Sequence, residues 1–142
     1  MLKVTQSDPA ALQSSWVSGG GSPRILVVED EEGLRSLMAE TLLERQFQVI
    51  TAADGVEALE LLDRYPGIQL IFSDVLMPRM GGYELVEQAL RGRPELKVVM
   101  VTAYATELPP PALLRAREIR TLHKPFDLDR LSSLANEMLS RP

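Results

Sequence analysis

Four apolar runs in this sequence each end on residues that can do chemistry. The residues at these ends are Glu29 with Asp30, Ser73 with Asp74, Thr102, and His123 with Lys124. Segments of helical length separate the runs, which is typical of parallel strands, and ligands of parallel sheets bind beyond the carboxyl ends of the strands. We therefore expect two carboxylates, a hydroxyl and an amine to meet in one pocket.

This set of side chains can hold a divalent cation and a phosphoryl group together. Magnesium takes about six oxygen ligands, of which proteins usually supply one or two carboxylates. Asp30, Asp74 and Glu29 could supply them, and because clustered carboxylates raise one another's pKa, they need a metal ion and Lys124 beside them. A carboxylate can attack phosphorus to form an acyl phosphate, and Asp74, central in the expected sheet, is the better candidate for this attack. Lys124 and Thr102 would neutralise phosphoryl oxygens.

The elements that must position these residues alternate between strand and helix five times. We expect strands at 25–28, 47–52, 68–74, 96–102 and 119–122. The first helix carries Leu34, Leu37, Met38, Thr41 and Leu42 on its inner face and Glu32, Arg35, Glu40, Glu44 and Arg45 on its outer face. Right-handed crossovers then predict an α/β fold, a doubly wound five-stranded parallel sheet of order 2-1-3-4-5, flavodoxin-like, with helices on both faces.

Local signals mark several helix ends. Asp54 followed by Glu57 predicts a capping box, and Asp127 is expected to cap the last helix. Three prolines at 109–111 cannot lie inside a regular helix, so the fourth helix is expected to be short and to start near Pro110 or Pro111. Asp30 has a simpler explanation as a cap of the first helix, although a cap would not need Glu29 beside it.

Length and composition favour one globular unit. The chain has 142 residues, is 45% hydrophobic and has a net charge of −5, so direct binding of nucleic acid is not expected. It has no cysteine and no apolar stretch long enough for a signal peptide or a membrane insertion, so we expect a cytoplasmic location. Residues 1–23 are rich in Ser, Gly and Pro and are expected to form a flexible arm or linker containing Trp16, before a domain at 24–142.

Taken together, the motifs resemble a receiver domain of bacterial two-component response regulators. The matching segments are Ile25 to Glu31 with the acidic pair, Asp74 to Pro78 followed by Gly81-Gly82, Val101-Thr102-Ala103, and Lys124-Pro125-Phe126. They span residues 25 to 139 in the order and at the spacing of the family. Four motifs in register are far more specific than any one alone.

The resemblance implies a phosphorylation-dependent signalling switch of a phosphorelay. Asp74 would accept a phosphoryl group from a histidine kinase or a histidine phosphotransfer protein, with Thr102 and Lys124 at the phosphoryl group. Mg²⁺ would bind Asp30, Asp74 and the backbone carbonyl of Leu76, with Glu29 acting through water. Such a protein is a phosphoacceptor that catalyses its own phosphorylation and dephosphorylation rather than a metabolic enzyme. Family members usually hold the Lys-Pro bond cis, so we predict a cis Lys124–Pro125 peptide.

Some positions depart from the family pattern. Thr121 stands where the family often has an aromatic residue that rotates on activation. Leu76 and Tyr104 stand at the positions that tune water access in the family, and we hypothesise that this bulky pair slows hydrolysis of the acyl phosphate. The lead-in to the domain resembles the linker before a terminal receiver in hybrid histidine kinases, and a freestanding receiver is an equal alternative. The output partner and homodimer formation stay open.

Two other functions compete with this interpretation. A phosphatase of the haloacid dehalogenase type also uses a nucleophilic aspartate, magnesium and a lysine, but Leu76 occupies the position of its second aspartate. A receiver-like binding module that is never phosphorylated would not need the intact acidic set. His123 as a metal ligand or phosphohistidine is disfavoured because the sequence has no cysteine and no second histidine to complete a site.

Overall fold

The computed structural model describes residues 23–103 and 119–140 of the chain. Its elements are β1 (Ile25–Val28), α2 (Glu32–Glu44), β2 (Val49–Ala52), α3 (Gly55–Arg64), β3 (Leu70–Asp74), α4 (Gly82–Gly92), β4 (Lys97–Thr102), β5 (Ile119–His123) and α6 (Leu128–Leu139). The expected arm, Trp16, the three prolines with their short helix, and Tyr104 lie outside the described residues.

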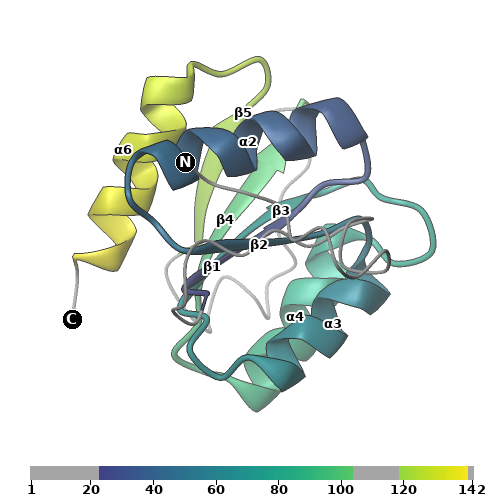
Figure 1. The fold of residues 1–142 in the computed structure, drawn as a ribbon. Coiled ribbons are helices and arrows are strands. Elements are labelled where there is room, and N and C mark those ends of the chain that lie inside the picture. The colour runs from purple at the N-terminus through teal and green to yellow at the C-terminus, as the bar shows by residue number, and fades with distance from the viewer. Residues whose placement is uncertain (1–22, 104–118, 141–142) are drawn as a thin grey trace, which may run out of the picture.

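The five strands form one parallel sheet in the order β2-β1-β3-β4-β5, which confirms the predicted fold class. Helices α2 and α6 cover one face of the sheet and α3 and α4 cover the other (Figure 1). Strand β2 begins at Val49 rather than at Phe47, because Gln46 and Phe47 still donate their amides to carbonyls of the last turn of α2.

Alternation along the strands produces two separate cores. On one face, Leu26 and Ile71 pack with α3 and α4, whereas Val27 and Phe72 pack with α2 and α6 on the other. These strand residues are at most 1% exposed, as expected for parallel strands that are covered on both sides. The sheet is therefore a rigid central layer that fixes the positions of its own strand ends.

Two residues of α2 lie on the side of the helix opposite to the one expected. Leu37 is 44% exposed, and it lines a largely apolar hollow of about 500 Å³ beside Lys124 and Phe126. Arg35 was expected on the outer face but is buried, because its guanidinium donates a hydrogen bond of 3.0 Å to the backbone carbonyl of Glu29. The arginine thereby ties the start of α2 to the end of β1.

The caps of the helices agree with the sequence in part. Asp54 accepts a hydrogen bond from the amide of Glu57 at the start of α3, and Glu57 accepts one from the amide of Ala53, so the predicted box is present with a shift of one residue. Asp127 stands at the start of α6, but its side chain makes no capping hydrogen bond. Among the described helices, none is long and apolar enough to cross a membrane.

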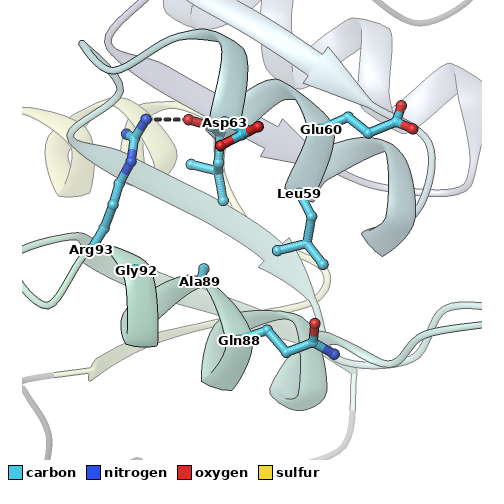
Figure 2. Close-up of a pocket in the computed structure, with 8 residues that line it drawn as sticks. Leu59, Glu60, Asp63, Gln88, Ala89, Gly92 and Arg93 are labelled. Atoms are coloured by element: carbon cyan, nitrogen blue, oxygen red, sulfur yellow. Dashed lines mark hydrogen bonds between the residues drawn. The ribbon is translucent and has the colours of Figure 1, made fainter.

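The side chain of Arg93 links backbone segments at the amino end of the sheet. Arg93, at the end of α4, donates hydrogen bonds of 2.7 Å to the carbonyls of Ile68 and Tyr65 and a further bond to the carbonyl of Leu62 at the end of α3. It borders a hollow of about 380 Å³ between α3 and α4, shown in Figure 2. The residues that line this hollow include none of the predicted site residues, so it is not the predicted site.

Candidate functional site

The predicted site residues meet at the carboxyl edge of the sheet. Glu29 and Asp30 follow β1, Asp74 ends β3, Thr102 ends β4 and Lys124 follows β5. The strands pair in register, with Val28 opposite Ser73 and Asp74 opposite Val101. Carboxylate oxygens of Glu29, Asp30 and Asp74 all lie within 4.8 Å of one another. The three acids are thus close enough to share one cation.

Burial makes this acidic cluster electrostatically costly. Glu29 and Asp74 are 1% and 7% exposed, whereas Asp30 faces solvent. Burial, with the charge of Asp74 adding to it, raises the pKa of Glu29 to about 7, even though the amide of Glu31 and the ammonium of Lys124 act in the opposite direction. The cluster therefore carries more negative charge than the protein itself neutralises, and its all-oxygen donor set fits Mg²⁺.

Asp30 is not needed as a helix cap. The cap of α2 is Glu31, whose carboxylate accepts hydrogen bonds of 3.2 Å and 2.7 Å from the amides of Gly33 and Leu34. This arrangement removes the simpler explanation for Asp30. Its carboxylate is left facing the cluster and the solvent.

Lys124 bridges two of the acids. Its Nζ lies 3.0 Å from Oδ2 of Asp74 and 3.2 Å from Oε1 of Glu29. Burial alone would lower the pKa of Lys124, but the hydrogen bond to Asp74 and the charges of both acids outweigh it and raise that pKa. The peptide bond between Lys124 and Pro125 is cis, as predicted, and the Lys124 amide donates to the carbonyl of Thr102 at 2.8 Å.

Asp74 is the last residue of β3, and the loop that follows it leads to the start of α4, which packs closely against Asp74. The amide of Leu76 lies 3.4 Å from Oδ1 of Asp74, and Leu76 is 54% exposed. The amide of Gly82 donates to the carbonyl of Val75 at 2.8 Å, and a Cβ at Gly82 would overlap the carbonyl oxygen of Asp74. Only glycine allows the helix to start this close to the acid.

The remaining predicted residues lie nearby in different environments. Thr102 is 3% exposed at the end of β4, next in the sheet to His123. His123 and Thr121 both face solvent on β5, so the disfavoured ligand role of His123 gains no support.

The family of the chain follows from comparison with known proteins. Residues 25–136 match the response regulator receiver domain family. The chain belongs to this family. It is 32% identical over 116 residues to the response regulator receiver protein CpdR of Brucella abortus, a match that covers 82% of this chain and 96% of CpdR. The receiver domain of NtrX from the same organism superposes with a TM-score of 0.74 at 30% identity, covering 83% of this chain and 99% of NtrX's.

A longer relative contains a similar domain. This chain is 35% identical over 122 residues to the sensor kinase CckA of Brucella abortus, a match that covers 85% of this chain and 13% of the kinase. The chain therefore spans only a small part of that relative, whereas it spans nearly all of CpdR.

Sequence reasoning missed two residues of this receiver domain that shape the site, because Arg35 holds the carbonyl of Glu29 and Arg79 pairs with the carboxylate of Asp54. Gly82 was part of the motif around Asp74, but its role in making room for the carbonyl of Asp74 was not predicted. The only feature of the sequence that could have indicated the role of Arg35 is its position in the first turn of the helix that follows the acidic pair. Nothing in the spacing of the chain pointed to Arg79, because its partner is 25 residues away.

Proposed function

We propose that this receiver domain is a phosphorylation-dependent switch in which Asp74 accepts a phosphoryl group from phosphohistidine. The donor would be a histidine kinase or a histidine phosphotransfer protein. The observation that carries the proposal is the cluster of three acids, two of them buried, whose oxygens lie within 4.8 Å of one another, with the Lys124 ammonium 3.0 Å from Asp74. Membership of the receiver family supports the same conclusion.

The proposed ligands of Mg²⁺ are Asp30, Asp74 and the backbone carbonyl of Leu76, with Glu29 acting through a water molecule. The uncompensated charge of the cluster and its oxygen donors support this set. When bound, Mg²⁺ neutralises negative charge on the phosphoryl oxygens. The exposure of Asp30 leaves one side of the cluster open to solvent and to a phosphoryl group.

In the proposed reaction, one carboxylate oxygen of Asp74 attacks the phosphorus atom of phosphohistidine. The new O–P bond forms an acyl phosphate while the P–N bond breaks, and its electron pair returns to the imidazole of the donor. Lys124 stabilises the phosphoryl oxygens, since its ammonium already lies beside the attacking carboxylate. Thr102 closes on the phosphoryl group from the neighbouring strand. Hydrolysis of the acyl phosphate resets the switch.

Phosphorylation would then bias two conformations of the domain and change its contacts with an output partner. Relatives include a protein of about the same length and a much longer sensor kinase, so a freestanding receiver and the receiver of a hybrid kinase both remain proposals. The net charge of −5 supports a protein partner rather than nucleic acid.

The experiment is transfer of radiolabelled phosphoryl from purified, autophosphorylated histidine kinases in the presence of Mg²⁺. We expect alkali-labile label on the wild type and none on Asp74→Asn. Ser73→Ala is the matched control, because it removes the neighbouring hydroxyl and should keep the label. Label that persists on Asp74→Asn would overturn the proposal, whether or not Ser73→Ala keeps its label.

A further inference from the structure

The loop from β3 to α4, residues 75–81, contains a backbone conformation that its residue type disfavours. Arg79 has a φ of 69°, in the left-handed region. The amide of Met80 donates to the carbonyl of Pro78 at 2.7 Å and closes a three-residue turn around Arg79. Such turns are rare and strained in a residue with a side chain, so they persist only where surrounding contacts hold them.

An ion pair holds the strained turn from one side. The guanidinium of Arg79 contacts Oδ2 of Asp54, the capping residue of α3. Asp54 is itself fixed, because its Oδ1 accepts a hydrogen bond of 2.9 Å from the amide of Glu57. Burial alone would raise the pKa of Asp54, but the amide of Glu57 and the guanidinium of Arg79 outweigh it and lower that pKa.

Close packing holds the turn from a second side. The side chain of Met80 lies directly against Gly55, where an added Cβ would come within 2.8 Å of the sulfur and 3.0 Å of Cβ and Cγ. This methionine also packs against the core between the sheet and α3 and α4. The loop is therefore attached to the start of α3 by one charged and one apolar contact.

We propose that Asp54 and Arg79, with the Met80–Gly55 contact, are positioning residues for the metal site. We call these four residues the loop clamp. Leu76 lies only three residues before Arg79, and its amide already lies 3.4 Å from the carboxylate of Asp74. The clamp fixes the loop so that the backbone of Leu76 stays beside Asp74. This inference rests on the proposed function, which places a metal ligand on that backbone.

The position of the loop matters because Mg²⁺ tolerates little deviation from octahedral geometry. A ligand carried by a loop that has moved would bind the ion less well, although the sheet and its carboxylates are unchanged. The clamp thus acts on ion affinity beyond its small contribution to stability.

Calorimetric titration with Mg²⁺ of the full chain and two variants tests this role. Arg79→Ala keeps the strained backbone but removes the pair, and Asp54→Asn keeps a residue that caps helices well but removes the charge. Each should bind Mg²⁺ about two- to five-fold more weakly, the range set by the energy of an exposed ion pair. The double variant should be no weaker than either single variant, because both break the same contact.

The signs of these changes separate positioning from simple electrostatics. Loss of a positive charge near an acidic site strengthens cation binding by charge alone, and loss of a negative charge weakens it. Only a clamp predicts weaker binding in both variants. Gly55→Ala adds a test without any change of charge, since it displaces Met80 and should also weaken binding. Arg79→Lys should restore most of the affinity.

Arg45→Ala is the matched control variant. It removes an arginine that pairs with Asp129 at 2.7 Å between α2 and α6, so it changes charge equally without touching the clamp. Its Mg²⁺ affinity should equal that of the wild type or slightly exceed it.

Hydrogen exchange in the absence of Mg²⁺ provides an independent readout. The amide of Met80 should exchange faster in Arg79→Ala and Asp54→Asn than in the wild type, while amides of β1 and β3 stay equally protected. Unchanged exchange with unchanged affinity, or affinities that move in opposite directions, would overturn the clamp. A wild type that binds no Mg²⁺ would overturn the proposed metal site, and the exchange of the Met80 amide would still decide whether the clamp orders the loop.

Discussion

The two edges of the sheet each hold a cation, and they use it in opposite ways. At the amino edge, Arg93 donates to three backbone carbonyls, so its charge meets the negative end of α3 and the turn that follows. At the carboxyl edge, Lys124 contacts two carboxylates of a cluster of three. The charge of Arg93 is matched by backbone carbonyls, whereas at the carboxyl edge three acids lie around the ammonium of Lys124.

This difference suggests that the contacts of the amino edge serve the stability of the fold and that those of the carboxyl edge serve the proposed function. The guanidinium of Arg93 is paired with backbone carbonyls of its own chain, so we expect it to contribute to folding. The carboxyl edge keeps a buried glutamate whose pKa is raised to about 7, an arrangement that costs stability until another cation arrives. Strained or costly groups that persist at one place in a fold are typical of functional sites.

The largest expected effect contrasts the two ends of α4. Gly82→Ala would place a Cβ on the carbonyl of Asp74 and on the side chain of Met100, so it should lower the free energy of unfolding by about 3 kcal/mol or more. Gly92→Ala has nothing within 4 Å and should raise it by up to about 1 kcal/mol. Urea unfolding followed by circular dichroism measures both, and equal effects would contradict the close packing of α4 on Asp74.

Removal of the cation at the amino edge should damage folding only. Arg93→Met keeps most of the apolar stem but leaves three carbonyls without their donor, so it should lower the free energy of unfolding by about 2 kcal/mol. The Mg²⁺ affinity of the folded protein should stay unchanged. If Arg93→Met kept the stability of the wild type but bound Mg²⁺ more weakly, the assignment of Arg93 to folding would be contradicted.

Neutralising an acid at the carboxyl edge should have the opposite effect on folding. Because the pKa of Glu29 rises from 4.5 to about 7 in the folded state, protonation stabilises the fold. This contribution is fully present below pH 4.5 and is lost as the pH rises through 7. Glu29→Gln should therefore match the wild type near pH 4 and exceed it by on the order of 2 kcal/mol at pH 8 without divalent cations.

Urea unfolding of the wild type and of Glu29→Gln at several pH values, with and without Mg²⁺, checks this prediction. Mg²⁺ should stabilise the wild type at pH 8 more than it stabilises Glu29→Gln. A constant difference between the two proteins from pH 4 to pH 8 would show that the charge of Glu29 carries no cost.

The smallest expected effect compares Gln46 and Arg79, the two non-glycine residues with positive φ within residues 23–103 and 119–140. Gln46 has a φ of 76° at the end of α2, at the amino edge, and Arg79 has a φ of 69° at the carboxyl edge. Gln46→Gly should stabilise the fold by about 0.5–1 kcal/mol, because only the backbone cost is removed. Arg79→Gly should gain less, since it also breaks the pair with Asp54, and it alone should weaken Mg²⁺ binding. Thermal unfolding and calorimetry of the two variants test this contrast.

The sequence was sufficient to predict the fold and the meeting of Glu29, Asp30 and Asp74 at one edge of the sheet. Apolar runs that are buried on both faces, with polar residues directly after them, leave few alternatives to a parallel sheet, and strand order then places Asp30 beside Asp74. The cis bond before Pro125 was predicted from the family resemblance rather than from the residues themselves.

The charged contacts that shape both edges could not be predicted in this way. Helical periodicity predicts an exposed position for Arg35, because arginine is treated as a polar residue. The guanidinium nevertheless donates a hydrogen bond to the carbonyl of Glu29. Arg93 and Arg79 depend on backbone groups or loops that only the tertiary structure brings near. Asp127 has the residue type and position of a helix cap, but its side chain makes no capping hydrogen bond, which residue type alone does not reveal.

The central claim is that Asp30 and Asp74 share one divalent cation. Calorimetric titration of the wild type, Asp30→Asn and Asp74→Asn with Mg²⁺ tests it most directly. The account predicts uptake of one ion by the wild type and at least a ten-fold loss of affinity in each variant, or about 1.4 kcal/mol. Absence of uptake by the wild type, or equal affinities in all three proteins, would contradict it.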